Sequence, residues 1–154
     1  MKWTTALVTL FATGFVLGVA PKAHADDQRD CSGESLMGSF GFTSTGFLLA
    51  LPPPSAGPFG EIGRQTFDGL GNTEGSATLS ANGNIRRVTF DGSYFVNPDC
   101  TGTMTLFIAP IGATAILDFV IDADGAEIRA IATGTGAIET RVYQKQFAKD
   151  RKGK

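Results

Sequence analysis

The fold is decided by residues 88–109, VTFDGSYFVNPDCTGTMTLFIA, in which two apolar alternations are separated by a turn. Side chains alternate between the two faces of an extended chain, so every second residue shares a face. The shared faces carry Val88, Phe90, Tyr94 and Val96 before the turn, and Met104, Leu106 and Ile108 after it. A turn of Asn, Pro and Asp between two such runs predicts an antiparallel hairpin.

The same pattern extends along most of the chain in both directions. Turn dipeptides such as Asp68-Gly69, Asn82-Gly83 and Asp124-Gly125 recur between short β-prone runs rich in Thr, Val, Ile and Phe. We find no helical periodicity from Leu36 onward. The turn residues leave room for eight strands between them, predicted at roughly 36–47, 59–67, 73–81, 85–96, 100–109, 114–121, 126–133 and 137–147.

Eight strands paired in sequence would leave two exposed edges unless the sheet closes on itself. The expected architecture is therefore all-β, an eight-stranded antiparallel up-and-down closed barrel of the calycin-like kind. A two-sheet sandwich is the alternative. An outer-membrane barrel is disfavoured, because Trp3 is the sole tryptophan and Tyr94 and Tyr143 are the sole tyrosines, too few for aromatic girdles at both interfaces.

The first 25 residues have the pattern of a secretory signal peptide. Lys2 precedes an apolar run, and Ala23-His24-Ala25 supplies the small residues that signal peptidase reads. We expect cleavage after Ala25, export to the periplasm or the extracellular space, and no membrane span afterwards. Residues 26–148 then form one barrel domain, and residues 149–154 a disordered basic tail.

Two cysteines in an exported chain are most simply one disulfide, Cys31 to Cys100. A reactive thiol is the alternative. Because the single histidine, His24, leaves with the signal, the mature chain has no Ser-His-Asp or Cys-His catalytic unit and no His-ligated metal site.

Composition and motifs further restrict the partners and cofactors that the sequence predicts. A formal net charge of −2 argues against a nucleic-acid partner. Asp122-Ala123-Asp124-Gly125 opens like a calcium loop, but the twelfth position is Thr133 instead of glutamate, so a hairpin turn is favoured over a metal. No metal or organic cofactor is expected.

Charges inside the predicted strands are the candidates for acid–base chemistry. Most should point outward, because a lone buried charge is costly. The charged strand residues are Glu61, Arg64, Arg86, Arg87, Asp118, Arg129, Glu139 and Arg141. Asp118 is singled out because both faces around it are apolar; turned inward, it would be an enclosed catalytic carboxylate. Turned outward, it would pair with a basic neighbour such as Arg129.

Three motif segments and the cysteine pair carry a resemblance. The segments are Leu36-Met37-Gly38-Ser39-Phe40-Gly41-Phe42, Phe67-Asp68-Gly69-Leu70-Gly71-Asn72 and Gly92-Ser93-Tyr94-Phe95-Val96-Asn97-Pro98-Asp99-Cys100-Thr101-Gly102-Thr103. Together they resemble a family of secreted bacterial β-barrel proteins of unknown function, similar in architecture to the allene oxide cyclase barrel. The resemblance implies a closed barrel and export, and it assigns no catalytic residue.

The sequence supports three functional hypotheses. Phe40, Phe42, Phe47 and Phe59 crowd the first hairpin, where they would line a cavity for a small apolar or amphipathic ligand. A cofactor-free cyclase or isomerase with an enclosed carboxylate is the second hypothesis. A structural or protein-interaction module with a solidly filled barrel is the third.

Overall fold

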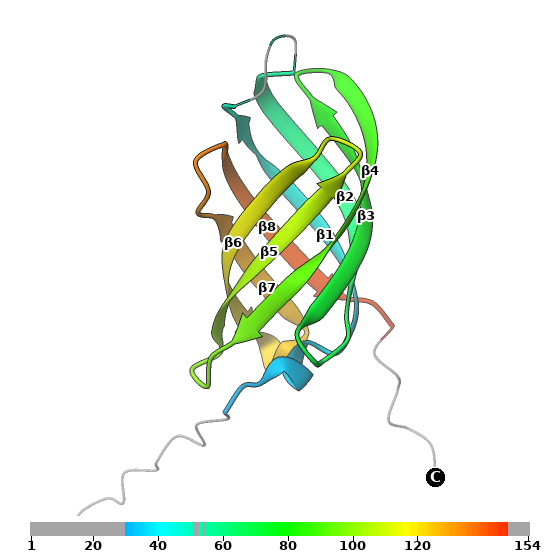
Figure 1. Cartoon of the computed structure of the whole chain (residues 1–154). Helices are drawn as coiled ribbons and strands as arrows, with labels where there is room; N and C mark the ends of the chain where they lie inside the picture. The colour runs from blue at the N-terminus through cyan, green and yellow to red at the C-terminus, as the bar shows by residue number, and fades with distance from the viewer. Residues whose placement is uncertain (1–29, 51–52, 54, 148–154) are drawn as a thin grey trace, which may run out of the picture.

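The computed structural model describes residues 30–50, 53 and 55–147, and they form a closed barrel (Figure 1). Each strand pairs antiparallel with the next in sequence, and the first also pairs with the last. Phe42, for example, is opposite Gly63 on one side and Tyr143 on the other. This closure confirms the predicted up-and-down barrel over the two-sheet sandwich.

The eight strands in the described part of the chain agree with the predicted ones to within two residues at every end. They are β1 (Gly38–Leu48), β2 (Gly57–Phe67), β3 (Asn72–Ala81), β4 (Asn84–Val96), β5 (Thr101–Ala109), β6 (Ala113–Asp122), β7 (Glu127–Ala132) and β8 (Ala137–Lys145). The agreement reflects how strongly alternation and turn residues specify short antiparallel strands.

The alternation also places the core as expected. The apolar face of the hairpin at 88–109 points into the barrel, and Val88, Phe90 and Met104 are all buried there. Glycines on the inner face make room for the larger rings. A Cβ atom added at Gly63 would lie 2.7 Å from the Phe42 ring, and one at Gly75 would lie 2.4 Å from the Phe90 ring. Neither position therefore accepts a side chain without moving an aromatic ring.

The N-terminal segment closes one end of the barrel. The expected first strand begins two residues late, because Gly33–Leu36 form a short 3₁₀ helix, η1, that precedes it. The Ser32 N–H donates to Ser35 Oγ at 3.1 Å, which tightens this turn. Leu36 is fully buried and packs in the core. We call residues 31–37 the end plug (blue in Figure 1).

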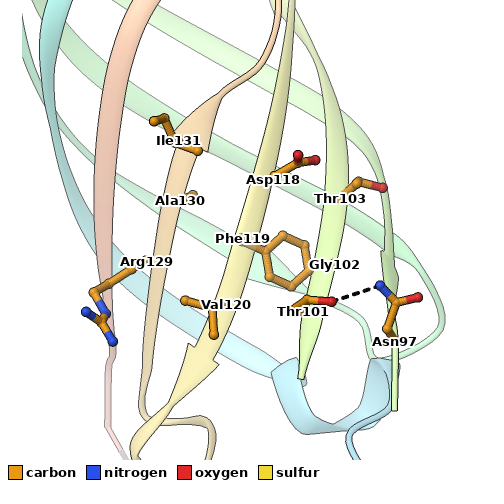
Figure 2. A pocket seen from close by; sticks show the side chains of 10 residues that line it. All are labelled: Asn97, Thr101, Gly102, Thr103, Asp118, Phe119, Val120, Arg129, Ala130 and Ile131. Carbon is orange, nitrogen blue, oxygen red and sulfur yellow. Dashed lines mark hydrogen bonds between the residues drawn. The ribbon is translucent and has the colours of Figure 1, made fainter. Parts of the chain in front are cut away.

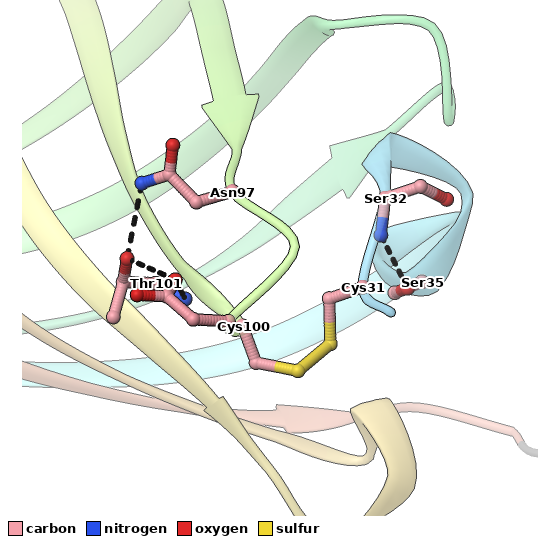
Figure 3. The surroundings of a disulfide bond; sticks show 7 residues. Cys31, Ser32, Ser35, Asn97, Cys100 and Thr101 are labelled. Carbon is pink, nitrogen blue, oxygen red and sulfur yellow. Dashed lines mark hydrogen bonds between the residues drawn. A yellow bond between two sulfur atoms is a disulfide. The ribbon is translucent and has the colours of Figure 1, made fainter. Parts of the chain in front are cut away.

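Two contacts fix the end plug to the barrel. The predicted disulfide is present and joins Cys31 to Cys100, in the turn between β4 and β5 (Figure 3). The Tyr94 hydroxyl accepts from the Gly69 N–H at 2.9 Å and donates to the Gly33 carbonyl at 3.2 Å. One end of the barrel is therefore sealed by covalent and hydrogen-bonded attachment.

The opposite end, which we call the upper end, carries the β1–β2, β3–β4, β5–β6 and β7–β8 turns (Figure 1). A second 3₁₀ turn, η2 (Ala123–Gly125), lies at the plugged end, where the Asp124-Gly125 turn was predicted. The predicted signal peptide and the basic tail lie outside the described residues. Among the described residues, no helix is long and apolar enough to cross a membrane.

Removing the disulfide should lower stability substantially. The cysteines are 69 residues apart in sequence, and closing a loop of that length in the unfolded chain corresponds to about 4 kcal/mol in the chain-entropy account. We expect the Cys31→Ser/Cys100→Ser variant to lose an amount of this order in urea unfolding, with its strand content by circular dichroism unchanged. A loss below about 1 kcal/mol would contradict this role of the bond.

Candidate functional site

Aromatic side chains fill the barrel from the end plug to about half its height. The Phe67 ring packs edge-on against Phe40 at a centroid distance of 5.5 Å and against Tyr94 at 5.1 Å. Tyr143 lies 6.2 Å from Phe67 and 5.3 Å from Phe42. This half of the barrel is a packed hydrophobic core.

A buried arginine lies directly on this aromatic layer. The Arg141 side chain is 3% exposed, and its guanidinium carbon is 4.5 Å from the centre of the Phe42 ring. Its Nε and Nη2 atoms donate to Glu139 Oε1 at 2.8 and 2.6 Å, and Nη2 also donates to Glu61 Oε2 at 3.0 Å. We call Glu61, Glu139 and Arg141 the ionic floor.

The ionic floor is tied to the core below it by a chain of hydrogen bonds. Arg141 Nη1 donates to the Tyr143 hydroxyl at 3.4 Å, and this hydroxyl donates to Gln65 Oε1 at 3.0 Å. Gln65 Nε2 donates to Thr73 Oγ1 at 2.9 Å, and Thr73 donates to the Thr66 carbonyl at 2.8 Å. Because a buried polar group without a partner is costly, this continuous chain holds each side chain in one orientation.

Each carboxylate of the ionic floor has one oxygen that accepts no hydrogen bond from Arg141 or Ser44. The hydrogen bonds of Arg141 and of the Ser44 hydroxyl (3.0 Å) reach only Oε2 of Glu61 and Oε1 of Glu139. Within the described part of the chain, no buried side-chain oxygen lacks a partner. Glu61 Oε1 and Glu139 Oε2 must therefore be accessible, and both residues line the cavity that lies over the floor.

Burial and charge set the protonation of the ionic floor. Burial raises the pKa of Glu61 above its ordinary value of 4.5, with Glu139 adding to the rise and Arg141 and Ser44 opposing it. Burial by itself would lower the pKa of Arg141, but Tyr143, Glu139 and Glu61 raise it above the ordinary value. The guanidinium therefore stays charged. Burial raises the pKa of Tyr143 as well, so its hydroxyl remains a donor.

Above the ionic floor the barrel encloses a cavity beside a small hydrophobic cluster of Phe59, Leu79 and Ala81. The upper cavity has a volume of about 230 Å³ and reaches the turns of the upper end. Its walls are almost entirely apolar, contributed by Leu48, Ala50, Phe59, Leu79, Val88, Ile108, Ile111, Ala113, Ala115, Ile116, Ala132 and Ala137. A small apolar cavity with a few charged groups at its base has the composition of a small-molecule site.

Asp118 lies elsewhere, on the outer surface. It is exposed and sits beside Thr103 and Ile131 in an open groove over β5, β6 and β7 (Figure 2). The hypothesis that Asp118 is an enclosed carboxylate is therefore wrong. The expected pairing with Arg129 is wrong too, since Arg129 Nε donates to Asp122 Oδ2 at 2.6 Å. Side-chain alternation puts Asp118 outside because Leu117 and Phe119 face the core.

The four phenylalanines expected to line one cavity are in three different places. Phe59 lines the upper cavity. Phe40 and Phe42 belong to the packed half of the barrel. Phe47 is 52% exposed on the outer face, because it is an odd number of residues from Phe42 and so points to the other side of β1. The expectation is confirmed for Phe59 and is wrong for Phe40, Phe42 and Phe47.

Five of the eight charged strand residues are exposed as predicted, and three point inward. The expectation that most strand charges face solvent is therefore confirmed, and Glu61, Glu139 and Arg141 are the exceptions, which form the ionic floor. Alternation could have found them. Glu139 and Arg141 share a face with the buried Tyr143, and Glu61 shares a face with Phe59, Gln65 and Phe67.

Comparison with known proteins gives the fold and no family. No protein-family model and no curated protein sequence matches the chain. Among solved structures, a redesigned β-barrel named b11L5F_LGL matches with TM-score 0.54 and 15% identity over 74% of this chain and 94% of that chain. The redesigned β-barrel mFAP1, bound to DFHBI, matches with TM-score 0.53 and 18% identity over 73% and 97%. EF1p2_mFAP2b, also bound to DFHBI, matches with TM-score 0.55 and 14% identity over 77% and 98%.

Replacing the buried arginine should be far more damaging than replacing an exposed one. Arg141→Met leaves Glu61 and Glu139 buried without a counter-charge, which typically costs about 3–5 kcal/mol. Arg129→Met is the matched control, since Arg129 pairs with Asp122 at the surface and such pairs contribute about 1 kcal/mol or less. Urea unfolding of both variants tests this. Equal losses would show that the ionic floor is not a buried charge cluster.

The stability of a Glu61→Gln variant, relative to that of the unmodified protein, should increase as the pH rises. The pKa of Glu61 is raised in the folded state, so its stabilising contribution is complete below the unfolded-state pKa and is lost as the pH rises through the folded-state pKa. Glu61→Gln removes that loss and keeps an acceptor for Ser44 and Arg141. As the pH rises above the ordinary pKa of 4.5, the free energy of unfolding of Glu61→Gln should therefore increase relative to that of the unmodified protein. A difference that stays constant or shrinks would contradict the burial of an ionisable Glu61.

Proposed function

We propose that this protein binds a small apolar or amphipathic molecule in the upper cavity, with the polar part of that molecule on the ionic floor. The observation that carries the proposal is the division of the barrel interior. One half is packed with aromatic rings and sealed by the end plug, whereas the other half is hollow, apolar-walled and charged at its base. A solidly filled structural barrel would have no such division.

The size of the upper cavity limits the ligand. An engineered apolar cavity of about 150 Å³ binds benzene. The upper cavity is somewhat larger, about 230 Å³, so it suits a single ring or a short aliphatic chain with one polar substituent. Burying such a group against apolar walls contributes about 25 cal/mol for each Å² of apolar surface removed from water.

The comparison structures are consistent with this proposal. Two of the similar barrels are bound to the small molecule DFHBI. They are too distant in sequence to transfer a ligand, but they have the same closed architecture and bind a small molecule.

Export is part of the proposal, and the disulfide between Cys31 and Cys100 supports it because such bonds persist in oxidising compartments.

A second candidate function is acid–base catalysis on a bound molecule, without a cofactor. The observation in its favour is that Glu61 combines a raised pKa with an oxygen open to the upper cavity, the combination expected of a general acid or base. Glu61 thus replaces Asp118 as the enclosed carboxylate. A ligand recovered chemically unchanged after long incubation supports binding. Conversion that Glu61→Gln abolishes would favour catalysis.

The binding proposal is tested by filling the upper cavity. Ala115 on β6 lines it, so Ala115→Leu should occupy the space of the ligand. Benzyl alcohol, which is small and amphipathic, is the probe, and isothermal titration calorimetry is the measurement. We expect Ala115→Leu to weaken binding at least about tenfold, which corresponds to about 1.4 kcal/mol.

The matched control is Thr105→Leu, an equally apolar substitution on the exposed face of the neighbouring strand β5. It should leave the affinity within about twofold of the unmodified protein. If the two variants weaken binding equally, the upper cavity is not the site. Unfolding midpoints of both variants confirm that each is folded at the titration temperature.

A further inference from the structure

The ionic floor has an unbalanced charge. It contains two carboxylates and one guanidinium, so with both glutamates ionised it has a net charge of −1. Ser44, Gln65, Thr73 and Tyr143 complete the set of polar groups around it, and all four are neutral hydrogen-bonding groups. No other described side chain of positive charge lines the upper cavity. A positive group entering from above would therefore complete the cluster.

The donors of the ionic floor are already in use. A guanidinium has five N–H groups, and four of those of Arg141 are committed to Glu139, Glu61 and Tyr143. Its face is covered by Phe42. The floor therefore has little with which to bind an anion, and the two glutamates would repel one.

The acceptors of the ionic floor are available. The side chains of Glu61 and Glu139 are 8% and 7% exposed, so both are more than nine-tenths buried. Each residue lines the upper cavity and has one accessible oxygen that accepts no hydrogen bond from Arg141 or Ser44. Hydrogen bonds to an ionised carboxylate are roughly twice as strong as those between neutral groups. An ammonium group has three donors and no acceptor, which matches two open carboxylate oxygens.

We infer that the ligand class is a small primary amine, in which a protonated amino group sits between Glu61 Oε1 and Glu139 Oε2 and a single ring or short chain fills the apolar walls. This inference rests on the proposed function, because it specifies the head group of the molecule in the upper cavity. A neutral alcohol donates one hydrogen bond and leaves the charge unbalanced. A carboxylate meets two like charges.

The test is a matched series of single-ring probes titrated by calorimetry near neutral pH: toluene, benzyl alcohol, benzylammonium and benzoate. We expect benzylammonium to bind about tenfold more tightly than benzyl alcohol, and benzoate to bind more weakly than either. Glu61→Gln keeps the acceptor for Ser44 and Arg141 but balances the charge of the floor. It should reduce the preference for benzylammonium over benzyl alcohol to about twofold or less.

Glu74→Gln is the control for net charge, since it removes one carboxylate from the exposed face of β3. It should leave the preference unchanged. Affinity for benzyl alcohol reports whether Glu61→Gln keeps an intact cavity, and Glu139→Gln provides a second test of the floor if Glu61→Gln does not fold.

Failure of this inference is distinct from failure of the proposed function. If benzyl alcohol binds but benzylammonium binds no more tightly, or if the preference persists in the variants of the floor, the amine assignment is overturned and the binding site stands. If no probe of the series binds, both the proposed function and the amine assignment are overturned.

Discussion

A charged arginine at the centre of a β-barrel is tolerated only if its surroundings compensate for the loss of water. Here Glu139 and Glu61 accept its hydrogen bonds, Tyr143 and Gln65 extend them downward, and Phe42 packs beneath the guanidinium. These requirements fix side chains on β1, β2 and β8 at the seam where the barrel closes. Because these contacts all lie at one level of the barrel, the ionic floor divides the interior into a packed half and a half that contains the upper cavity.

The two ends of the barrel are closed to different extents. The disulfide and Tyr94 attach the end plug at the packed end, where Leu36 is fully buried. At the upper end, small side chains such as Ala113, Ala115, Ala132 and Ala137 line the wall and leave the volume unfilled. Eight strands enclose just enough space for side chains or for one small ligand. This barrel is filled by side chains below the ionic floor and left hollow above it.

Much of the fold follows from local sequence features, whereas the site does not. Strand positions follow from alternation and turn residues, both of which are read within a dozen residues, and the disulfide follows from two cysteines. The ionic floor depends on Glu61 and Arg141, which are 80 residues apart and become neighbours only because β1 lies between β2 and β8. Because burying a single charge is costly, Glu61 and Arg141 are each expected to face solvent when considered alone. Once the barrel is closed, side-chain alternation places both on the inner face, where they pair.

Strand phase also explains why the predicted inward positions of Asp118 and Phe47 are wrong. Asp118 has apolar neighbours and Phe47 is itself apolar, but on β6 and β1 both have the phase of outward residues, and both are exposed. Phase within a strand therefore predicts the lining of a small barrel better than residue type. For Glu61, Glu139 and Arg141, strand phase indicates an inward position, whereas the cost of burying a single charge favours an outward one.

The most direct test of a hollow upper half above an ionic floor is the position of a bound probe. Intermolecular nuclear Overhauser effects between benzylammonium and methyl-labelled protein would locate it. We expect contacts from the aromatic ring to the methyl groups of Leu79, Ile108 and Ala115, which line the upper cavity. Contacts confined to the exposed methyl groups of Ile131 and Ile138 on the outer face would contradict it.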